Sequence, residues 1–238
     1  MKRTRTLLLA LFSALLISLG QIATAQMAAP AQPGAATDVY HVYFVKAALG
    51  KAVALGDLLK TPDPKAPMPG HFLLLRHQEG DMWDYVMIEH LGAKATVQAA
   101  PTPQPEFAPG LSDWHNDTFV SGPSWPEFTK AMGMGDDAAK SAAGVYIVSV
   151  FRAAAGHRDQ LQKSLADPTG GTAGSIMMTH LEGGPWQFLR VERYASWQDL
   201  AASESKGLAD TAKPDSPWRK LREDVAMHTD TLTDRVAP

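Results

Sequence analysis

Hydrophobic and polar positions alternate in two segments that lie 106 residues apart. Residues 39–50 read VYHVYFVKAALG and residues 145–156 read VYIVSVFRAAAG, and both are rich in Val, Tyr and Phe. Alternation with this composition predicts a β-strand in each segment. A helical segment is expected after each strand, over residues 51–60 and over residues 157–166.

A second pair of matching segments predicts a β-hairpin in each half. Residues 77–86 (HQEGDMWDYV) match residues 180–189 (HLEGGPWQFL) at an offset of 103, and the same offset places Glu89 on Glu192. The Glu-Gly turns are expected to join two strands each. These strands are residues 72–77 and 83–90 in the first half, and residues 176–180 and 186–193 in the second.

A third match completes each half. Residues 115–119 (HNDTF) and 228–232 (HTDTL) lie 113 residues apart and share the pattern His-x-Asp-Thr, which is expected to form a last, short strand. Three collinear matches with small changes of offset indicate an internal duplication.

Two serines in the second half mark expected helix starts. Ser196 begins one helix, and Ser216 followed by Pro217 begins another, because serine is a preferred N-cap and proline fits the first helical position. An apolar stripe is expected on the second of these helices. Its members are Trp218, Leu221 and Val225.

The region between the two halves reads as a linker. It follows a Pro-rich stretch at residues 101–109 and contains Ser124 and Glu127, which form a capping box and predict a short helix. Residues 133–143 are expected to form a loop or a poorly formed helix that links the halves. The expected organisation is a signal peptide (1–25), a disordered leader (26–37), a first repeat (38–123), a linker with a short helix (124–143) and a second repeat (144–238).

The order strand, helix, hairpin, helix, strand, present twice, resembles the dimeric α-β barrel superfamily of ferredoxin-like domains. The resemblance covers residues 38–236 and implies an α+β fold in which the antiparallel sheets of two tandem ferredoxin-like repeats close an intramolecular barrel. Members of this superfamily include cofactor-free monooxygenases, haem-degrading enzymes, haem-dependent chlorite dismutases and isomerases. No motif in the chain selects one of these activities, and a fold does not fix a function.

The N-terminal segment has the features of a secretory signal. Lys2, Arg3 and Arg5 precede an apolar core at residues 7–19, and small residues up to Ala25 suit signal peptidase. A spanning helix needs roughly 20 apolar residues, so cleavage is favoured over a membrane anchor. We therefore expect a periplasmic or secreted protein with no stable membrane insertion after cleavage near Ala25.

Composition narrows the classes of function. The chain has no cysteine, which excludes disulfides, thiolate metal sites and cysteine nucleophiles. After cleavage it would carry 19 Lys and Arg against 25 Asp and Glu, because three of the 22 basic residues lie in the signal. A negative net charge without a basic run argues against nucleic acid as a partner.

The alternation also divides the strands into two faces. Val42, Phe44, Val148 and Val150 make the uniformly apolar face, which is expected to lie under the helices. The other face is then expected to line the barrel interior as one cavity. Its candidate catalytic residues are His41, Tyr43, Glu89, Arg190 and Glu192, and its candidate ligand-binding residues are Tyr85, Met87, Ser149 and Phe188.

Two interpretations of these carboxylates stand side by side. In an apolar cavity, Glu89 or Glu192 would have a raised pKa and could act as a general base near neutral pH. Alternatively, either of them pairs with Arg190 or another basic group and only closes the barrel, since buried charges are normally paired. The structural interpretation is favoured.

The His-x-Asp pairs are weaker candidates for metal binding or proton transfer. His115 with Asp117, and His228 with Asp230, share one face of a strand, and an aspartate beside a histidine can fix its tautomer. A pair that holds the last strand of each half is the favoured interpretation, because the pattern occurs in both halves. His77 and His180, six residues before Trp83 and Trp186, are likewise explained by hairpin contacts or, less favoured, as haem or metal ligands.

Three functions fit these features. The first is a binder of a small apolar or aromatic molecule, the second is a cofactor-free or haem-dependent oxygenase or isomerase, and the third is a protein-interaction module. No motif implies a cofactor, and haem stays open through the resemblance. A small-molecule ligand and a monomeric or homodimeric chain are expected.

Overall fold

The computed structural model describes residues 36–61, 71–97, 109–134, 144–182 and 185–238. The expected signal peptide, nearly all of the expected leader and of the Pro-rich stretch, and most of the expected loop at 133–143 lie outside these ranges. Within them, no helix combines the length and the apolarity that crossing a bilayer requires.

Eight strands and five helices make up the described part of the chain. The strands are β1 (Asp38–Ala47), β2 (Phe72–Glu79), β3 (Tyr85–Ala93), β4 (Ser112–Gly122), β5 (Val145–Ala153), β6 (Gly174–Glu182), β7 (Phe188–Tyr194) and β8 (Val225–Ala237). The helices are α1 (Ala52–Leu59), α2 (Trp125–Ala131), α4 (Arg158–Ala166), α5 (Trp197–Thr211) and α6 (Pro217–Asp224).

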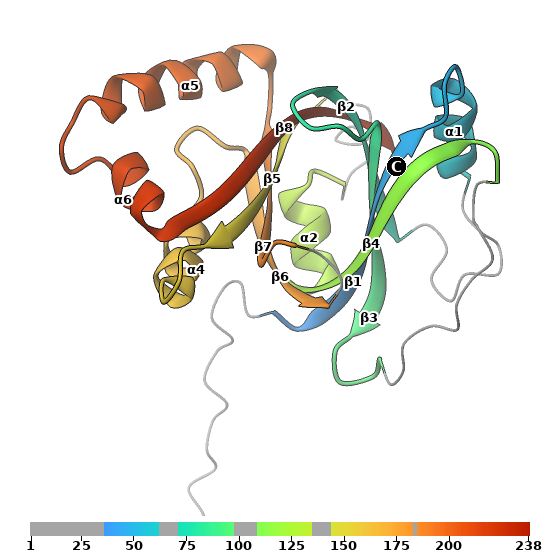
Figure 1. Cartoon of the computed structure of the whole chain (residues 1–238), viewed down its shortest axis with the longest axis horizontal. Coiled ribbons are helices and arrows are strands. Elements are labelled where there is room, and N and C mark those ends of the chain that lie inside the picture. Colours follow the sequence, from blue (N-terminus) through green and yellow to red (C-terminus); the bar gives the residue numbers. More distant parts are fainter. Residues whose placement is uncertain (1–35, 62–70, 98–108, 135–143, 183–184) are drawn as a thin grey trace, which may run out of the picture. The chain divides into compact units, whose positions relative to one another are not determined.

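All eight strands pair antiparallel and form one closed barrel in the order β1-β3-β2-β8-β5-β7-β6-β4 (Figure 1). The strands of the first half lie in the order β4-β1-β3-β2, and those of the second in the equivalent order β8-β5-β7-β6. The halves join through β2 with β8 and through β4 with β6. The mixed α+β fold expected from the sequence is therefore present.

The local signals in the sequence are confirmed. α1 and α4 occupy the predicted helical segments, and the predicted hairpins are β2–β3 and β6–β7. Ser124 and Glu127 form the capping box of α2. The side chains of Ser196 and Ser216 accept hydrogen bonds from backbone N–H groups at the starts of α5 and α6, which satisfies donors that have no partner inside the helix.

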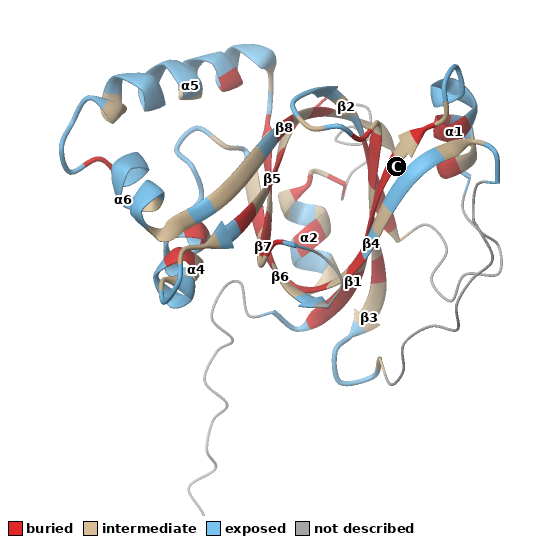
Figure 2. Cartoon of the chain, viewed as in Figure 1, coloured by how far each residue is buried: buried red, intermediate tan, exposed pale blue. Residues whose placement is uncertain are grey.

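The apolar stripe predicted on α6 is wrong. Val225 already belongs to β8, and Trp218 is 51% exposed, with the Arg222 guanidinium over its ring. Leu221 alone of the three packs from the helix against the buried residues under α4. Figure 2 shows α5 and α6 almost entirely in the colour of exposed residues. The last strands, at 11 and 13 residues, are also longer than predicted.

One hydrophobic cluster fills the barrel interior and draws on both halves and on α2. Val42, Phe44 and Val148 belong to it, and Val150 packs against it. This corrects the prediction that these four residues lie under the helices. The cluster also contains Tyr40, Leu73, Leu75, Trp83, Val86, Ile88, Val120, Phe128, Met132, Met134, Tyr146, Ile176, Met178, Trp186, Leu189 and Val191.

The opposite strand face points outward, toward the helices. Leu55 and Leu59 of α1 pack with Tyr43 and Val45, and α4 packs in the same way on the second half. Alternation shows which residues share a face, but it does not show which face is enclosed. The enclosed face of a small barrel excludes water completely, whereas helices cover the outer face only in part, so the more uniformly apolar face lies inside.

Helix α2 connects the two halves through the interior cluster (Figure 1). At its N-terminal end the Trp125 backbone N–H donates to Asp38 Oδ2 at 3.0 Å, and Tyr40 donates to the Pro123 carbonyl at 2.8 Å. Asp38 and Tyr40 both belong to β1. A carboxylate at this end suits the partial positive charge of a helix N-terminus.

Groups of the second half hold the other end of α2. Arg193 Nε donates to the Ala131 carbonyl at 3.0 Å, Tyr146 donates to the Met132 carbonyl at 2.9 Å, and Arg235 Nη1 donates to the Gly133 carbonyl at 2.9 Å. Two arginines thus meet the partial negative charge of the C-terminal end. The polarity of α2 requires an acid in one half and bases in the other.

We expect Phe128→Ala to destabilise the whole barrel. Phe128 is fully buried and contacts both Tyr40 and Trp125, so its removal leaves a cavity where the halves meet. The expected loss is about 3–5 kcal/mol in the free energy of unfolding, measured by urea denaturation. The control is Val53→Ala on α1, which is 77% exposed and should change stability by less than about 0.5 kcal/mol. Equal effects of the two substitutions would contradict the central position of α2.

Candidate functional site

The residues predicted to share one cavity lie on the outer face, in two separate groups. His41, Tyr43, Tyr85, Met87 and Glu89 are on β1 and β3, whereas Ser149, Phe188, Arg190 and Glu192 are on β5 and β7. β7 pairs with β5 and β6 and with neither β1 nor β3. The alternation placed each group correctly on one face, but the proposal of one interior cavity is wrong because that face points away from the interior.

His41 is the centre of a charged cluster on the first half. Its Nε2 lies 2.9 Å from Asp117 Oδ1, and its Nδ1 lies 3.5 Å from Glu89 Oε2. Burial lowers the pKa of His41, but hydrogen bonds to Asp117 and Glu89 and their negative charges outweigh it and raise the pKa to about 9. His41 is therefore protonated at neutral pH and is not a general base there.

Tyr43, Tyr85 and Met87 pack on the side of the sheet that α1 covers. Tyr43 and Tyr85 are in the buried cluster with the α1 leucines, and Met87 packs against that cluster. Tyr85 donates a hydrogen bond to the Ala52 carbonyl at 2.9 Å. Burial is the main reason why the pKa of Tyr85 is raised. These contacts attach α1 to the sheet.

The second group forms a structural ion pair. Arg190 Nη2 lies 3.3 Å from Glu192 Oε2, and Glu192 also accepts a hydrogen bond from the Thr169 backbone N–H at 3.0 Å. The Arg190 guanidinium lies over the Phe151 ring, and Phe188 is buried beside that ring under α4. Ser149, paired in register with Arg190, is also buried. This arrangement supports the interpretation in which the charges pair.

The histidine and the aspartate of each His-x-Asp pair lie in close contact. His115 Nε2 lies 3.2 Å from Asp117 Oδ2, and His228 Nε2 lies 3.4 Å from Asp230 Oδ2. Across the residues that the structure describes, no group of three or more His, Cys, Asp or Glu could hold a metal ion.

The predicted hairpin contacts are present. The rings of His77 and Trp83 are 5.7 Å apart, and those of His180 and Trp186 are 5.0 Å apart. The two tryptophans belong to the interior cluster, and both contact the Phe44 ring. These residues pack the part of the interior around Phe44, as the structural interpretation holds.

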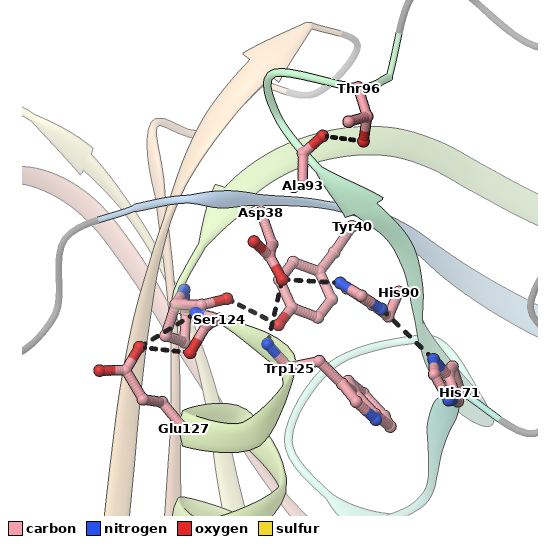
Figure 3. Close-up of polar contacts among 10 residues, drawn as sticks. Asp38, Tyr40, His71, His90, Ala93, Thr96, Ser124, Trp125 and Glu127 are labelled. Carbon is pink, nitrogen blue, oxygen red and sulfur yellow. Dashed lines mark hydrogen bonds and ion pairs between the residues drawn. The ribbon is translucent and has the colours of Figure 1, made fainter.

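A different set of polar residues lies beside α2, and the sequence analysis did not identify it (Figure 3). His90 Nε2 lies 2.8 Å from Asp38 Oδ2, and His90 Nδ1 lies 3.4 Å from His71 Nδ1. The side chains of His90 and Asp38 are 5% and 10% exposed, whereas His71 is half-buried. Asp38, His90 and His71 thus form a hydrogen-bonded chain from a buried carboxylate to a half-buried histidine.

The order of donors and acceptors along this chain is fixed at the aspartate. An ionised Asp38 can only accept, so His90 carries its proton on Nε2 and donates it. Nδ1 of neutral His90 is then an acceptor, and His71 donates to it from Nδ1. The Nε2 atom of neutral His71 is left with a lone pair. Asp38 thereby makes one specified atom, His71 Nε2, the available base.

Aromatic rings pack against His71 and His90, and the environment of His71 lowers its pKa. Trp125 stacks on His71 at 4.8 Å and on His90 at 5.2 Å between ring centroids, and Tyr40 lies 5.1 Å from His90. Burial and the positive charge that His90 can carry lower the pKa of His71. Neutral His71 is therefore the dominant form near neutral pH, as a general base requires.

The sequence contains one signal of this site. Asp38 and His90 lie in strands on the same faces as Val42 and Ile88, so they are polar residues on an apolar face. Polar groups enclosed with an apolar face must find partners. His71 has no such signal, because it precedes β2 and reaches His90 only through the β2–β3 pairing.

Comparison with solved structures identifies the type of barrel. An anthrone oxidase-like protein superimposes with a TM-score of 0.57 at 12% identity, over 85% of this chain and 92% of that one. The chain therefore has a dimeric α-β barrel type of fold. A proposed monooxygenase from Lactobacillus acidophilus NCFM gives a TM-score of 0.46 at 12% identity, over 85% of this chain and 99% of that one, so the assignment rests on the first structure. No family model and no curated protein matches the sequence.

The His41 cluster gives a testable dependence of stability on pH. Folding raises the pKa of His41 from 6.5 to about 9, so its contribution is complete below pH 6.5 and is lost as the pH rises through 9. The shift corresponds to about 3 kcal/mol at most. Screening reduces this to about 1 kcal/mol, since the Asp117 side chain is 44% exposed.

We expect His41→Gln to remove this loss of stability between pH 6.5 and 10, measured as the free energy of unfolding in urea at each pH. Asp117→Asn is the graded variant, because it removes one of the two carboxylates and should move the loss to lower pH. A His41→Gln chain with the wild-type pH profile would show that another group titrates.

Proposed function

We propose that the protein binds a small aromatic molecule beside Trp125 and removes a proton from it, in a cofactor-independent oxidation by dioxygen. The observation that carries the proposal is the chain Asp38–His90–His71, which prepares one base atom beside a stacked tryptophan. The fold shared with an anthrone oxidase-like protein supports the same class of reaction.

His71, His90 and Asp38 each have a role in the proposed proton transfer. A ring methylene or hydroxyl of the substrate gives its proton to His71 Nε2, and the electron pair stays in the ring system. His71 becomes an imidazolium and keeps its Nδ1 hydrogen bond to His90, while the Asp38 carboxylate balances the new charge through His90. Dioxygen then accepts the electrons, and His71 returns its proton to the reduced oxygen. A methylene with O2 gives a carbonyl and water, whereas a hydroquinone with O2 gives a quinone and hydrogen peroxide.

Aromatic surroundings favour a planar apolar substrate. The Trp125 ring lies nearly parallel to each histidine ring, with interplanar angles of 18° to His71 and 16° to His90, while the two histidine rings are tilted by 34° to each other. Flat rings add to such a stack with about 0.5–1.5 kcal/mol per contact beyond the area that they bury. A half-buried His71 beside this stack can meet a substrate that enters from outside.

The proposal includes one site per chain within a tandem arrangement. Two features support a duplication: the three sequence matches and the equivalent strand order in both halves. On the same offsets, Asp38 corresponds to Gly144 and His90 to Arg193. Arg193 donates a hydrogen bond to the Ala131 carbonyl at the C-terminal end of α2. The position that contributes His90 to the histidine chain in the first half therefore binds the helix in the second half.

We further propose that the chain is exported and cleaved after Ala25, on the strength of its N-terminal pattern. Expression of the full chain in a Gram-negative host should place it in the periplasmic fraction with a new N-terminus at Gln26, read by N-terminal mass spectrometry. An intact N-terminus in the cytoplasmic fraction would contradict export.

The proposed reaction is tested by oxygen uptake with a panel of anthrones and polyphenols. His71→Gln should lower turnover by about a hundredfold to ten-thousandfold, because a general base is lost. Asp38→Asn should lower it less, since the base stays but its orientation is no longer fixed. His157→Gln, at an ion pair with Asp224 on the second half, is the matched control and should keep full turnover.

Two outcomes of this panel would overturn the proposal. Undiminished turnover in His71→Gln would remove the base from the reaction. Stabilisation of the chain by a panel member without oxygen uptake would identify a binder instead of an enzyme, since a ligand that binds only the folded state raises its melting temperature.

A further inference from the structure

His71 and His90 face each other through the same atom of the imidazole ring. The two Nδ1 atoms are 3.4 Å apart, so one must carry a hydrogen and the other must not. This contact accepts a single extra proton, because protonation of His71 at Nε2 leaves its Nδ1 donor unchanged. A second proton must go to His90 Nδ1, where it would meet the hydrogen of His71.

Among the residues that the structure describes, few charges near the pair could compensate a second proton. Asp38 on β1 lies against His90, but one carboxylate balances one imidazolium. Glu127 on α2 is bound to the backbone and hydroxyl of Ser124. Tyr40 on β1 donates to the Pro123 carbonyl, and burial followed by the charges of Asp38 and Glu127 raises its pKa, so it stays neutral.

The pair also supports the N-terminal end of α2. Trp125 stacks on both histidine rings, and its backbone N–H donates to Asp38 Oδ2, the same oxygen that His90 contacts. Rings that repel each other cannot both stay under Trp125. Separation of the histidines therefore leaves Trp125 with Phe128 as its stacking partner and disturbs the carboxylate that holds the helix.

We propose that the His71–His90 pair is an acid-operated latch on the N-terminal end of α2, which is closed while the pair holds at most one extra proton and opens when it holds two. The latch would regulate the site of the proposed function. Its regulatory role rests on that proposed function, but the structural change itself does not. Acidification would open the end of the barrel at which the base lies.

The direction of the pH effect follows from burial and charge. Both lower the pKa of His71 below 6.5, so the stabilisation due to its neutral form is present above pH 6.5 and is lost as the pH falls. The two protonations are coupled by repulsion across the shared contact, so the opening belongs to the pair and not to either histidine alone.

Fluorine NMR of the full chain labelled with 5-fluorotryptophan tests the latch. The chain has six tryptophans, and Trp125→Phe assigns the resonance of Trp125. On titration from about pH 8 to about pH 4.5, the latch predicts that this resonance moves below pH 6.5, before the other five and before unfolding.

Three variants define the result. His71→Gln should abolish the separate transition, and Asp38→Asn should move it to higher pH because the compensating carboxylate is lost. His157→Gln should titrate as the unaltered chain does. The proposed latch is contradicted if the Trp125 resonance shows the same separate transition in His71→Gln as in the unaltered chain. It is also contradicted if all six tryptophan resonances of the unaltered chain move together.

Oxygen uptake on the same samples separates this inference from the proposed function. If the unaltered chain shows the separate Trp125 transition but no oxygen uptake, the latch is supported and the proposed enzymatic function is contradicted. If it shows oxygen uptake but no separate transition, the proposed enzymatic function is supported and the latch is contradicted.

Discussion

The buried carboxylate of Asp38 is the interaction on which the arrangement depends. One of its oxygens accepts hydrogen bonds from His90 and from the first residue of α2. The first bond determines which nitrogen of each histidine is free, and the second holds a helix that contributes to the interior cluster of both halves. Removal of one partner from such a buried pair typically costs about 3–5 kcal/mol, so the site and the core are coupled through a single side chain.

The polarity of α2 explains why two halves with the same strand order have different polar groups. A helix has a partial positive N-terminus and a partial negative C-terminus, so an acid suits one end and bases suit the other. Asp38 occupies the first position, and Arg193 and Arg235 occupy the second. A symmetrical pair of sites could not hold one directional helix between them. The asymmetry places the histidine pair in the first half only, among the described residues.

Local features were predictable from the sequence, and enclosure was not. Caps, hairpins and strand positions depend on neighbouring residues, and Ser124, Ser196 and Ser216 each cap a helix as predicted. The inward face depends on closure of the barrel, which no single strand encodes, so His41 and Glu89 were assigned to the wrong side. Asp38, His71, His90 and Trp125 come from separate segments without a common spacing, and only the fold brings them together. Asp38 and His90, as polar residues on an apolar face, were the detectable part of this site.

Asp38 fixes the proton positions in the chain that it forms with His90 and His71. Nitrogen-15 NMR of the full chain labelled at histidine measures these positions directly near pH 7.5, with His71→Gln, His90→Gln and Asp38→Asn used for assignment. This role of Asp38 predicts a protonated Nε2 and an unprotonated Nδ1 in His90, together with a protonated Nδ1 and an unprotonated Nε2 in His71. A His71 that carries its proton on Nε2, or a His90 tautomer that is unchanged in Asp38→Asn, would contradict it.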